Sequence, residues 1–196
     1  NIKISSPAVQ GLIITPTREL ALQITKVAEK IGKVNGVRVL TIYGGQDIDR
    51  QLKKLNAAPH IVIGTPGRIL DHLRRKTLTI NHVNKLVLDE ADQLLHMGFL
   101  DEVEELIVNT APERQTMFFS ATIPAKIKAL SVNYMKKPKD LKVMSNSVTL
   151  DEINQIIVET KEEFKLDKLC GLINQYQPYL AMIFCHTKQR VSNLVA

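Results

Sequence analysis

Short apolar runs alternate with helix-period segments along most of the chain. Five runs predict strands, at Gly11–Thr15, Val37–Tyr43, His60–Gly64, Lys85–Asp89 and Gln115–Ser120. Between them, apolar side chains recur at helical spacing, first at Ile24, Val27, Ala28 and Ile31, and later at Ile127, Leu130, Ser131 and Tyr134. Strands that alternate with helices favour an α/β fold, and we predict a doubly wound parallel sheet.

The pattern is interrupted after Val143. The polar stretch that follows predicts a linker at residues 144–152, after which an apolar pattern resumes. The second segment contains an extended run at Ile153–Thr160, a helix with apolar positions and a strand at Tyr179–Cys185; the helix positions are Leu166, Leu169, Cys170 and Ile173. We therefore predict most of one domain in residues 1–143 and the beginning of another in residues 153–196. Because the chain begins without methionine and stops within a helix-period segment, we expect both ends to be cuts.

Composition narrows the class of protein. Hydrophobic residues make up 44% of the 196 residues, which is enough for a packed core. No apolar stretch approaches the roughly 18 residues of a membrane-spanning helix, and the N-terminus lacks signal-peptide features. We therefore expect a soluble intracellular protein. Cys170 and Cys185 form no C-x-x-C motif, and we expect ordinary core thiols rather than a disulfide or a metal site.

The positive charge is concentrated in the first part of the chain. Residues 1–143 contain 21 basic and 14 acidic side chains, whereas residues 144–196 contain 5 and 6. A basic excess favours a polyanionic partner, because lysine and arginine that neutralise phosphates release condensed counterions. Judged from charge alone, ordinary solvated surface lysine explains the excess nearly as well as a polyanionic partner does.

Polar motifs follow each of the five predicted strands. They are Thr15-Pro16-Thr17-Arg18-Glu19-Leu20, Gly44-Gly45, Thr65-Pro66-Gly67-Arg68, Asp89-Glu90-Ala91-Asp92 and Ser120-Ala121-Thr122. In open α/β sheets, ligands bind at the carboxyl ends of the strands. The five motifs therefore predict one binding edge.

The acidic motif has two interpretations. Carboxylates at a helix N-terminus are stabilised by the helix dipole, which is a common reason for a single one. Three in four residues, Asp89, Glu90 and Asp92, would repel one another unless a cation or basic partner lies among them, so we favour a metal site. Ser120 and Thr122 end the next predicted strand and are expected within hydrogen-bond reach of those carboxylates.

The other motifs also have structural interpretations. Thr17 and Thr65 are suitable helix N-caps, and a Gly-Gly pair often forms a tight turn. Capping does not explain Arg18 and Arg68, which place positive charge at helix N-termini, where the dipole disfavours it. An external anion would remove that conflict.

Taken together, the ordered motifs resemble those of the DEAD-box ATP-dependent RNA helicases. The set is completed by Ile183-Phe184-Cys185-His186-Thr187-Lys188 near the C-terminus. The resemblance covers practically the whole chain. It implies a RecA-like fold, cytoplasmic location, ATP and Mg²⁺ as cofactors, and RNA as partner.

The resemblance also implies roles for individual residues. Asp89 would bind Mg²⁺ through water, Glu90 would position or activate the hydrolytic water, and Asp92 would bond toward Ser120 and Thr122. The implied RNA-backbone contacts are Thr17, Arg18, Gly44, Gly45, Thr65, Gly67 and Arg68 in the first domain, with Thr187 and Lys188 in the second. Such contacts position a strand without reading its bases.

The sequence lacks three features of the family pattern. It contains no G-x-x-x-x-G-K-[ST] phosphate loop, no adenine-reading segment before such a loop, and none of the later motifs with arginine fingers. We therefore expect the 196 residues alone to hydrolyse ATP negligibly, whereas the parent protein would be an RNA helicase or RNP remodeller. Two alternatives remain: a non-hydrolysing RNA-binding scaffold and a metal-dependent nuclease.

Overall fold

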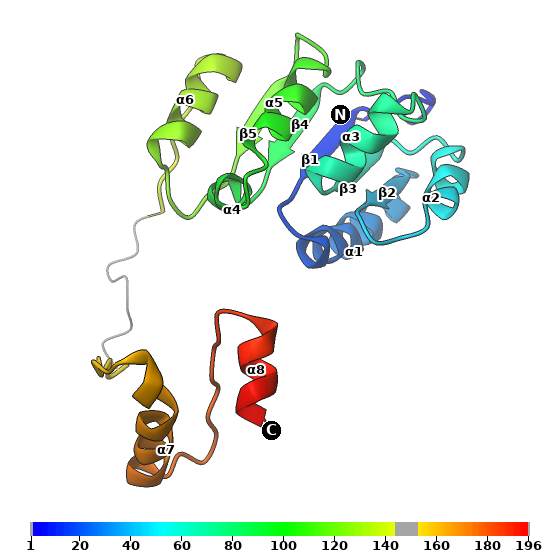
Figure 1. Ribbon diagram of the computed structural model, residues 1–196. Coiled ribbons are helices and arrows are strands. Elements are labelled where there is room, and N and C mark those ends of the chain that lie inside the picture. The colour runs from blue at the N-terminus through cyan, green and yellow to red at the C-terminus, as the bar shows by residue number, and fades with distance from the viewer. Residues whose placement is uncertain (1, 144–152, 196) are drawn as a thin grey trace. The chain divides into compact units, whose positions relative to one another are not determined.

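The computed structural model describes residues 2–143 and 153–195, so the predicted linker at residues 144–152 lies outside the described part. The chain forms two compact units, Asn1–Asp140 and Leu141–Ala196, and each is described by itself. Figure 1 shows the helices and strands of both units.

The first unit is built on a parallel sheet of five strands. The strands are β1 Gly11–Ile14, β2 Val39–Ile42, β3 Ile61–Gly64, β4 Lys85–Leu88 and β5 Gln115–Phe118. Their order across the sheet is β2-β3-β1-β4-β5, and every neighbouring pair is parallel. The order confirms the doubly wound prediction, because successive strands are added on one side of β1 and then on the other.

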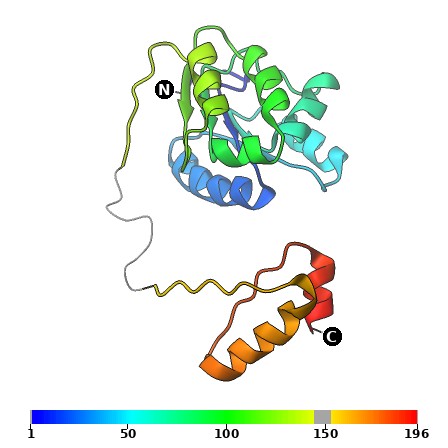
Figure 2. The ribbon, with the colours of Figure 1, turned by 60° about the vertical axis from the view of Figure 1, so that its left-hand side comes forward.

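Helices cover both faces of this sheet. They are α1 Arg18–Val34, α2 Ile48–Leu55, α3 Pro66–Arg74, α4 Ala91–His96, α5 Leu100–Val108 and α6 Ala125–Tyr134. Helices α3 and α5 lie side by side in front of the sheet in Figure 1, and α1 lies on the other face, as the turned view in Figure 2 makes clear. The enclosed core is aliphatic, with Leu12, Ile14, Val62, Leu86 and Leu88 fully buried.

The strand register brings the strand ends to one level. Ile14 pairs with Gly64 on one side and with Leu88 on the other, and Leu88 pairs in turn with Phe118. Ile42 pairs with Gly64 at the far side. The residues that follow all five strands therefore share the carboxyl edge of the sheet.

Helix α1 buries a face that overlaps only in part with the one predicted. Val27 and Ile31 are 56% and 64% exposed, whereas Ala21, Thr25 and Gly32 face the interior. A Cβ atom added at Gly32 would lie 2.8 Å from the Val37 carbonyl oxygen. The chain that leaves α1 passes too close to Gly32 for a side chain there. The predicted face was wrong at Val27 and Ile31, whereas Ile24 and Ala28 are half-buried. The predicted face of α6 is confirmed at Ile127 and Leu130, both 2% exposed.

The second unit contains a short 3₁₀ turn at Glu162–Phe164, α7 Lys165–Tyr176 and α8 Lys188–Val195. Glu162 pairs with Lys165 at 2.5 Å and with Arg190 at 2.6 Å. The predicted strand Tyr179–Cys185 is wrong, because this segment has no strand partner among the described residues. No described residue of 153–195 is fully buried, and Cys170, expected in a core, is an exposed free thiol. Within the described residues, no helix is long and apolar enough to cross a membrane.

Candidate functional site at the carboxyl edge of the sheet

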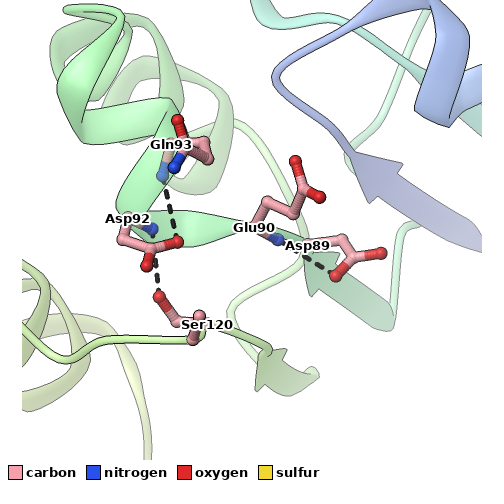
Figure 3. A pocket seen from close by; sticks show the side chains of 6 residues that line it. Asp89, Glu90, Asp92, Gln93 and Ser120 are labelled. Atoms are coloured by element: carbon pink, nitrogen blue, oxygen red, sulfur yellow. Dashed lines mark hydrogen bonds between the residues drawn. The ribbon is translucent and has the colours of Figure 1, made fainter. Parts of the chain in front are cut away.

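The acidic and hydroxyl motifs meet where β4 and β5 end. A cavity of about 280 Å³ lies between them, lined by Asp89, Glu90, Asp92, Gln93, Ser120 and Ala121 (Figure 3). Backbone hydrogen bonds hold the two loops together. The Ala91 amide donates to the Phe119 carbonyl at 3.0 Å, and the Phe119 amide donates to the Leu88 carbonyl at 2.8 Å.

Asp92 is the buried centre of this site. It is 4% exposed, and its Oδ2 accepts hydrogen bonds from the Thr122 amide at 3.0 Å and the Thr122 hydroxyl at 2.7 Å. The Asp92 amide donates to Ser120 Oγ at 3.0 Å, and that hydroxyl donates to the Thr122 carbonyl at 2.6 Å. Burial acts to raise the pKa of Asp92, but hydrogen bonds from Thr122 and its neighbours outweigh it and lower the pKa below its ordinary value. Asp92 is therefore ionised, and its hydrogen bonds connect the loop after β4 to the loop after β5.

Glu90 has the least usual backbone of the motif. It precedes α4 with φ 49° and ψ 52°, in the left-handed region that residues other than glycine rarely occupy. Its amide donates to Asp89 Oδ1 at 3.0 Å. The conformation turns the chain sharply from strand to helix, so the Glu90 carboxylate is exposed at the edge while Asp92 points back into the fold (Figure 3). Such strain is found mainly where function requires it.

The three carboxylates do not converge on one cation. Asp92 is committed to the Ser120–Thr122 loop, and Figure 3 shows Asp89 directed away from it. Across the described parts of the chain, no group of three or more His, Cys, Asp or Glu side chains is placed to hold a metal ion. This donor set fits Mg²⁺ nevertheless, because Mg²⁺ keeps several waters and is held by one or two carboxylates together with substrate phosphates. Asp89, half-buried at the edge, is the residue that suits this role.

The two threonine motifs begin helices, but only one threonine is a cap through its side chain. Thr17 Oγ1 accepts from the Leu20 amide at 3.2 Å, whereas Thr65 makes no capping hydrogen bond before α3. The first amides of a helix have no intrahelical partner, and Pro66 has no amide hydrogen. The amides of Gly67 and Arg68 therefore lie at an uncapped, electropositive helix end that suits an anion.

The glycines of these motifs differ in whether backbone conformation or close packing requires a glycine at that position. Gly45 has φ +79°, which favours glycine, but neither Gly44 nor Gly67 has a positive φ. A Cβ atom added at Gly44 or Gly67 would meet no heavy atom within 4 Å. Gly64 is the contrast, since its added Cβ would lie 1.9 Å from the Ile42 carbonyl oxygen. Packing explains Gly64, whereas Gly44 and Gly67 leave exposed backbone open to a partner from outside.

The two arginines are held by the residues around the glycine pair. Arg18 lies over the Tyr43 ring, with its guanidinium carbon 4.9 Å from the ring centroid. Arg68 donates from Nη1 to the Gln46 carbonyl at 3.1 Å and lies 3.9 Å from Asp71. These contacts anchor both side chains, so a phosphate would meet preformed positive charge at the edge.

The structure thus brings Thr17, Arg18, Gly44, Gly45, Thr65, Gly67 and Arg68 to the same edge of the first unit as Asp89, Glu90, Asp92, Ser120 and Thr122. Thr187 and Lys188 lie in the second unit, where the Thr187 hydroxyl accepts from the Arg190 amide at 3.2 Å at the start of α8. Their predicted contact with RNA stays a prediction, as do the roles of the other site residues.

Sequence reasoning missed four residues that build the edge. Tyr43 and Gln46 flank the glycine pair, and Gln51 and His72 lie beneath it, fully buried. An aromatic residue directly before Gly44-Gly45 was a usable signal for Tyr43. Nothing in the pattern distinguishes Gln51 from the exposed polar residues of α2.

Comparison with known proteins agrees with this geometry. A model of the DEAD/DEAH box helicase family matches residues 1–130. The DEAD-box ATP-dependent RNA helicase CshA of Bacillus subtilis is 46% identical over 189 residues, covering 96% of this chain and 38% of that relative. CshA of Geobacillus kaustophilus is 45% identical over 193 residues, covering 98% of this chain and 41% of that relative. The chain therefore spans about two fifths of the length of these relatives.

Solved structures show the same likeness. A DEAD box protein from Methanococcus jannaschii matches with a TM-score of 0.67 and 36% identity, over 99% of this chain and 52% of that one. The yeast DEAD-box splicing factor Prp28 matches with a TM-score of 0.64 and 34% identity, over 66% of this chain and 31% of that one.

Proposed function

Because the chain belongs to the DEAD/DEAH box helicase family, we propose that the whole protein is an ATP-dependent RNA helicase or RNP remodeller. The observation that carries the proposal is the shared level of the five strand ends. This shared edge carries two neighbouring surfaces. One is an acidic pocket suited to Mg²⁺ and the phosphates of a nucleotide, and the other is suited to an RNA backbone. Residues 1–143 would be most of its first RecA-like domain, and residues 153–196 the beginning of its second.

In the nucleotide half of the proposed site, Asp89 would hold Mg²⁺ through its water shell. The bound ion would neutralise charge that develops on the transferred phosphate. Glu90, exposed beside Asp89, would orient the attacking water. Asp92 would connect the nucleotide side of β4 to the Ser120–Thr122 loop, since its carboxylate already holds that loop through two hydrogen bonds. A phosphate loop would have to come from outside these 196 residues, and we expect negligible hydrolysis by them alone.

In the RNA half, the bare backbone at Gly44 and Gly67 and the charges of Arg18 and Arg68 favour contacts with phosphate and sugar. These contacts read no bases, so binding would be largely independent of sequence. We expect Arg68→Ala to weaken RNA binding similarly for different RNA sequences and to reduce the salt slope by about one. A loss confined to one RNA sequence would contradict the proposal.

The decisive experiment measures ATP hydrolysis by the whole protein with Mg²⁺, with and without single-stranded RNA, for wild type and Glu90→Gln. The proposal expects RNA to raise turnover in the wild type, and Glu90→Gln to abolish turnover while RNA binding survives. RNA binding without hydrolysis in the wild type would favour the scaffold alternative. Shortened RNA in place of ADP and phosphate would favour the nuclease.

A further inference from the structure

A buried polar chain links the glycine pair to two helices. Gln51 in α2 is 1% exposed and His72 in α3 is fully buried. Gln51 Nε2 donates to the Tyr43 carbonyl at 3.0 Å, while Gln51 Oε1 lies 3.0 Å from His72 Nε2. On the far side of the ring, Thr77 Oγ1 lies 2.9 Å from His72 Nδ1. The chain thus runs from α3 through α2 to the residue directly before Gly44.

The partners fix the orientation of the Gln51 amide and one proton of the His72 ring, whereas the Thr77 hydroxyl lies 2.9 Å from His72 Nδ1 and 3.0 Å from the His72 carbonyl and has one hydrogen to donate. An amide oxygen only accepts, so His72 Nε2 carries the proton that it shares with Gln51. Burial lowers the pKa of His72, and the charge of Arg68 acts in the same direction, which favours the neutral ring. The donor of Gln51 is thereby left pointing at the Tyr43 carbonyl.

This chain forms one of two anchors between α3 and the loop after β2. The other is Arg68, whose Nη1 donates to the Gln46 carbonyl at 3.1 Å. Arg68 and His72 are four residues apart and so lie on the same face of α3. The two anchored carbonyls, of Tyr43 and Gln46, bracket Gly44 and Gly45. A flexible glycine pair is therefore fixed at both ends against the helix whose N-terminus carries Gly67.

Packing alone does not call for these polar groups. Apolar side chains of similar volume would fill the same space without the penalty of burying an amide and an imidazole. A fully paired polar network does fix direction and distance, which apolar packing does not. We therefore look for the role of Gln51 and His72 in the loop that they orient, which contains Gly44 and Gly45.

We propose that Gln51 and His72 are positioning residues for RNA binding, which hold the Gly44–Gly45 backbone in register with the N-terminus of α3 so that both meet one RNA backbone. The inference rests on the proposed function. Neither side chain touches RNA itself, since both are buried, and they act through the Tyr43 carbonyl.

The test compares His72→Met, which removes the ring donor, with His72→Gln, which keeps a side-chain N–H near the same position, and adds Gln51→Met. In the whole protein, RNA-stimulated ATP hydrolysis gives the half-saturating RNA concentration and the turnover at saturating RNA. Both methionine variants are expected to raise the half-saturating concentration about three- to tenfold, which corresponds to one lost hydrogen bond, with turnover little changed. His72→Gln is expected to restore it to within about twofold of wild type. If Gln51→Met fails to fold, the His72 pair decides alone.

Thr110→Val is the matched control. Thr110 is 5% exposed and its hydroxyl donates to the Ile107 carbonyl at 2.7 Å, at the opposite edge of the sheet. It should lower the thermal midpoint without changing RNA half-saturation. Methionine variants that lose stability as the control does, but keep wild-type RNA half-saturation, would overturn the inference. A wild type that neither binds RNA nor responds to it would overturn the proposed function as well.

Discussion

Replacing Gly67 by alanine should separate the stability of the first unit from the RNA binding that we propose for it. Gly67 lies in the first turn of α3, its φ is not positive, and an added Cβ would meet no heavy atom within 4 Å. Alanine should therefore be accepted without strain. Glycine in a helix interior is less favourable than alanine by about 0.5–1 kcal/mol, and Gly67 lies in the first turn, so Gly67→Ala should raise the free energy of unfolding by at most about that amount.

The same methyl group would stand between the backbone and an RNA phosphate. A hydrogen bond from an amide to a charged group is worth about 1.5–3 kcal/mol, so losing the Gly67 contact should weaken RNA binding about ten- to hundredfold. No charge is removed, and the slope of log affinity against log salt should stay as in the wild type. Arg68→Ala would differ, since it removes a charge and flattens the slope.

Two measurements check this prediction. Urea unfolding followed by circular dichroism reports the stability, because the chain has no tryptophan, and fluorescence anisotropy of labelled RNA reports the affinity at several salt concentrations. Gly171→Ala is a control in α7, where an added Cβ also meets no heavy atom within 4 Å. It should leave RNA affinity unchanged. If Gly67→Ala bound RNA as tightly as the wild type, the bare backbone would have no role in binding; a loss of stability would refute the structural reasoning itself.

Three further outcomes are expected from single substitutions. Glu90→Gly should be more stable than Glu90→Ala by about 1 kcal/mol in urea unfolding, because only glycine relieves the positive φ; a more stable alanine variant would contradict the strain. Thr122→Val should destabilise the unit by about 1 kcal/mol at pH 7. Since the folded pKa of Asp92 lies below its ordinary value, this contribution is complete above the ordinary pKa and should disappear as the pH falls through the folded one; an equal loss in acid would count against it. Asp71→Asn should tighten RNA binding about two- to fivefold at low salt by removing a negative charge that lies 3.9 Å from Arg68 and 2.7 Å from Arg75, and the gain should vanish at high salt; binding no tighter at low salt would refute it.

Local pattern predicted the fold of the first unit because all five strands are short, because four of them, β1 to β4, are largely aliphatic and buried, and because helices separate them. It chose the wrong face of α1 for a physical reason. Where other parts of the chain lie close against the helix, small residues such as Ala21 and Gly32 are enclosed, and larger ones such as Val27 and Ile31 stay outside. The strand predicted at Tyr179–Cys185 failed for another reason: a strand exists only when another pairs with it.

In the candidate site, some residues can be identified from the sequence around them, and others only from contacts with residues distant in the sequence. The motif residues were visible because each follows a strand, and parallel strands in register must end together. The sequence did not single out Gln51 and His72, because their role depends on a hydrogen bond between residues 21 positions apart, in two different helices, and on a second bond to the Tyr43 carbonyl. A sequence pattern identifies the groups that would face a ligand at the edge of a sheet. The buried groups that hold the edge in shape are identified by their partners, and the different responses expected of His72→Met and His72→Gln would show that this shape is part of how RNA is bound.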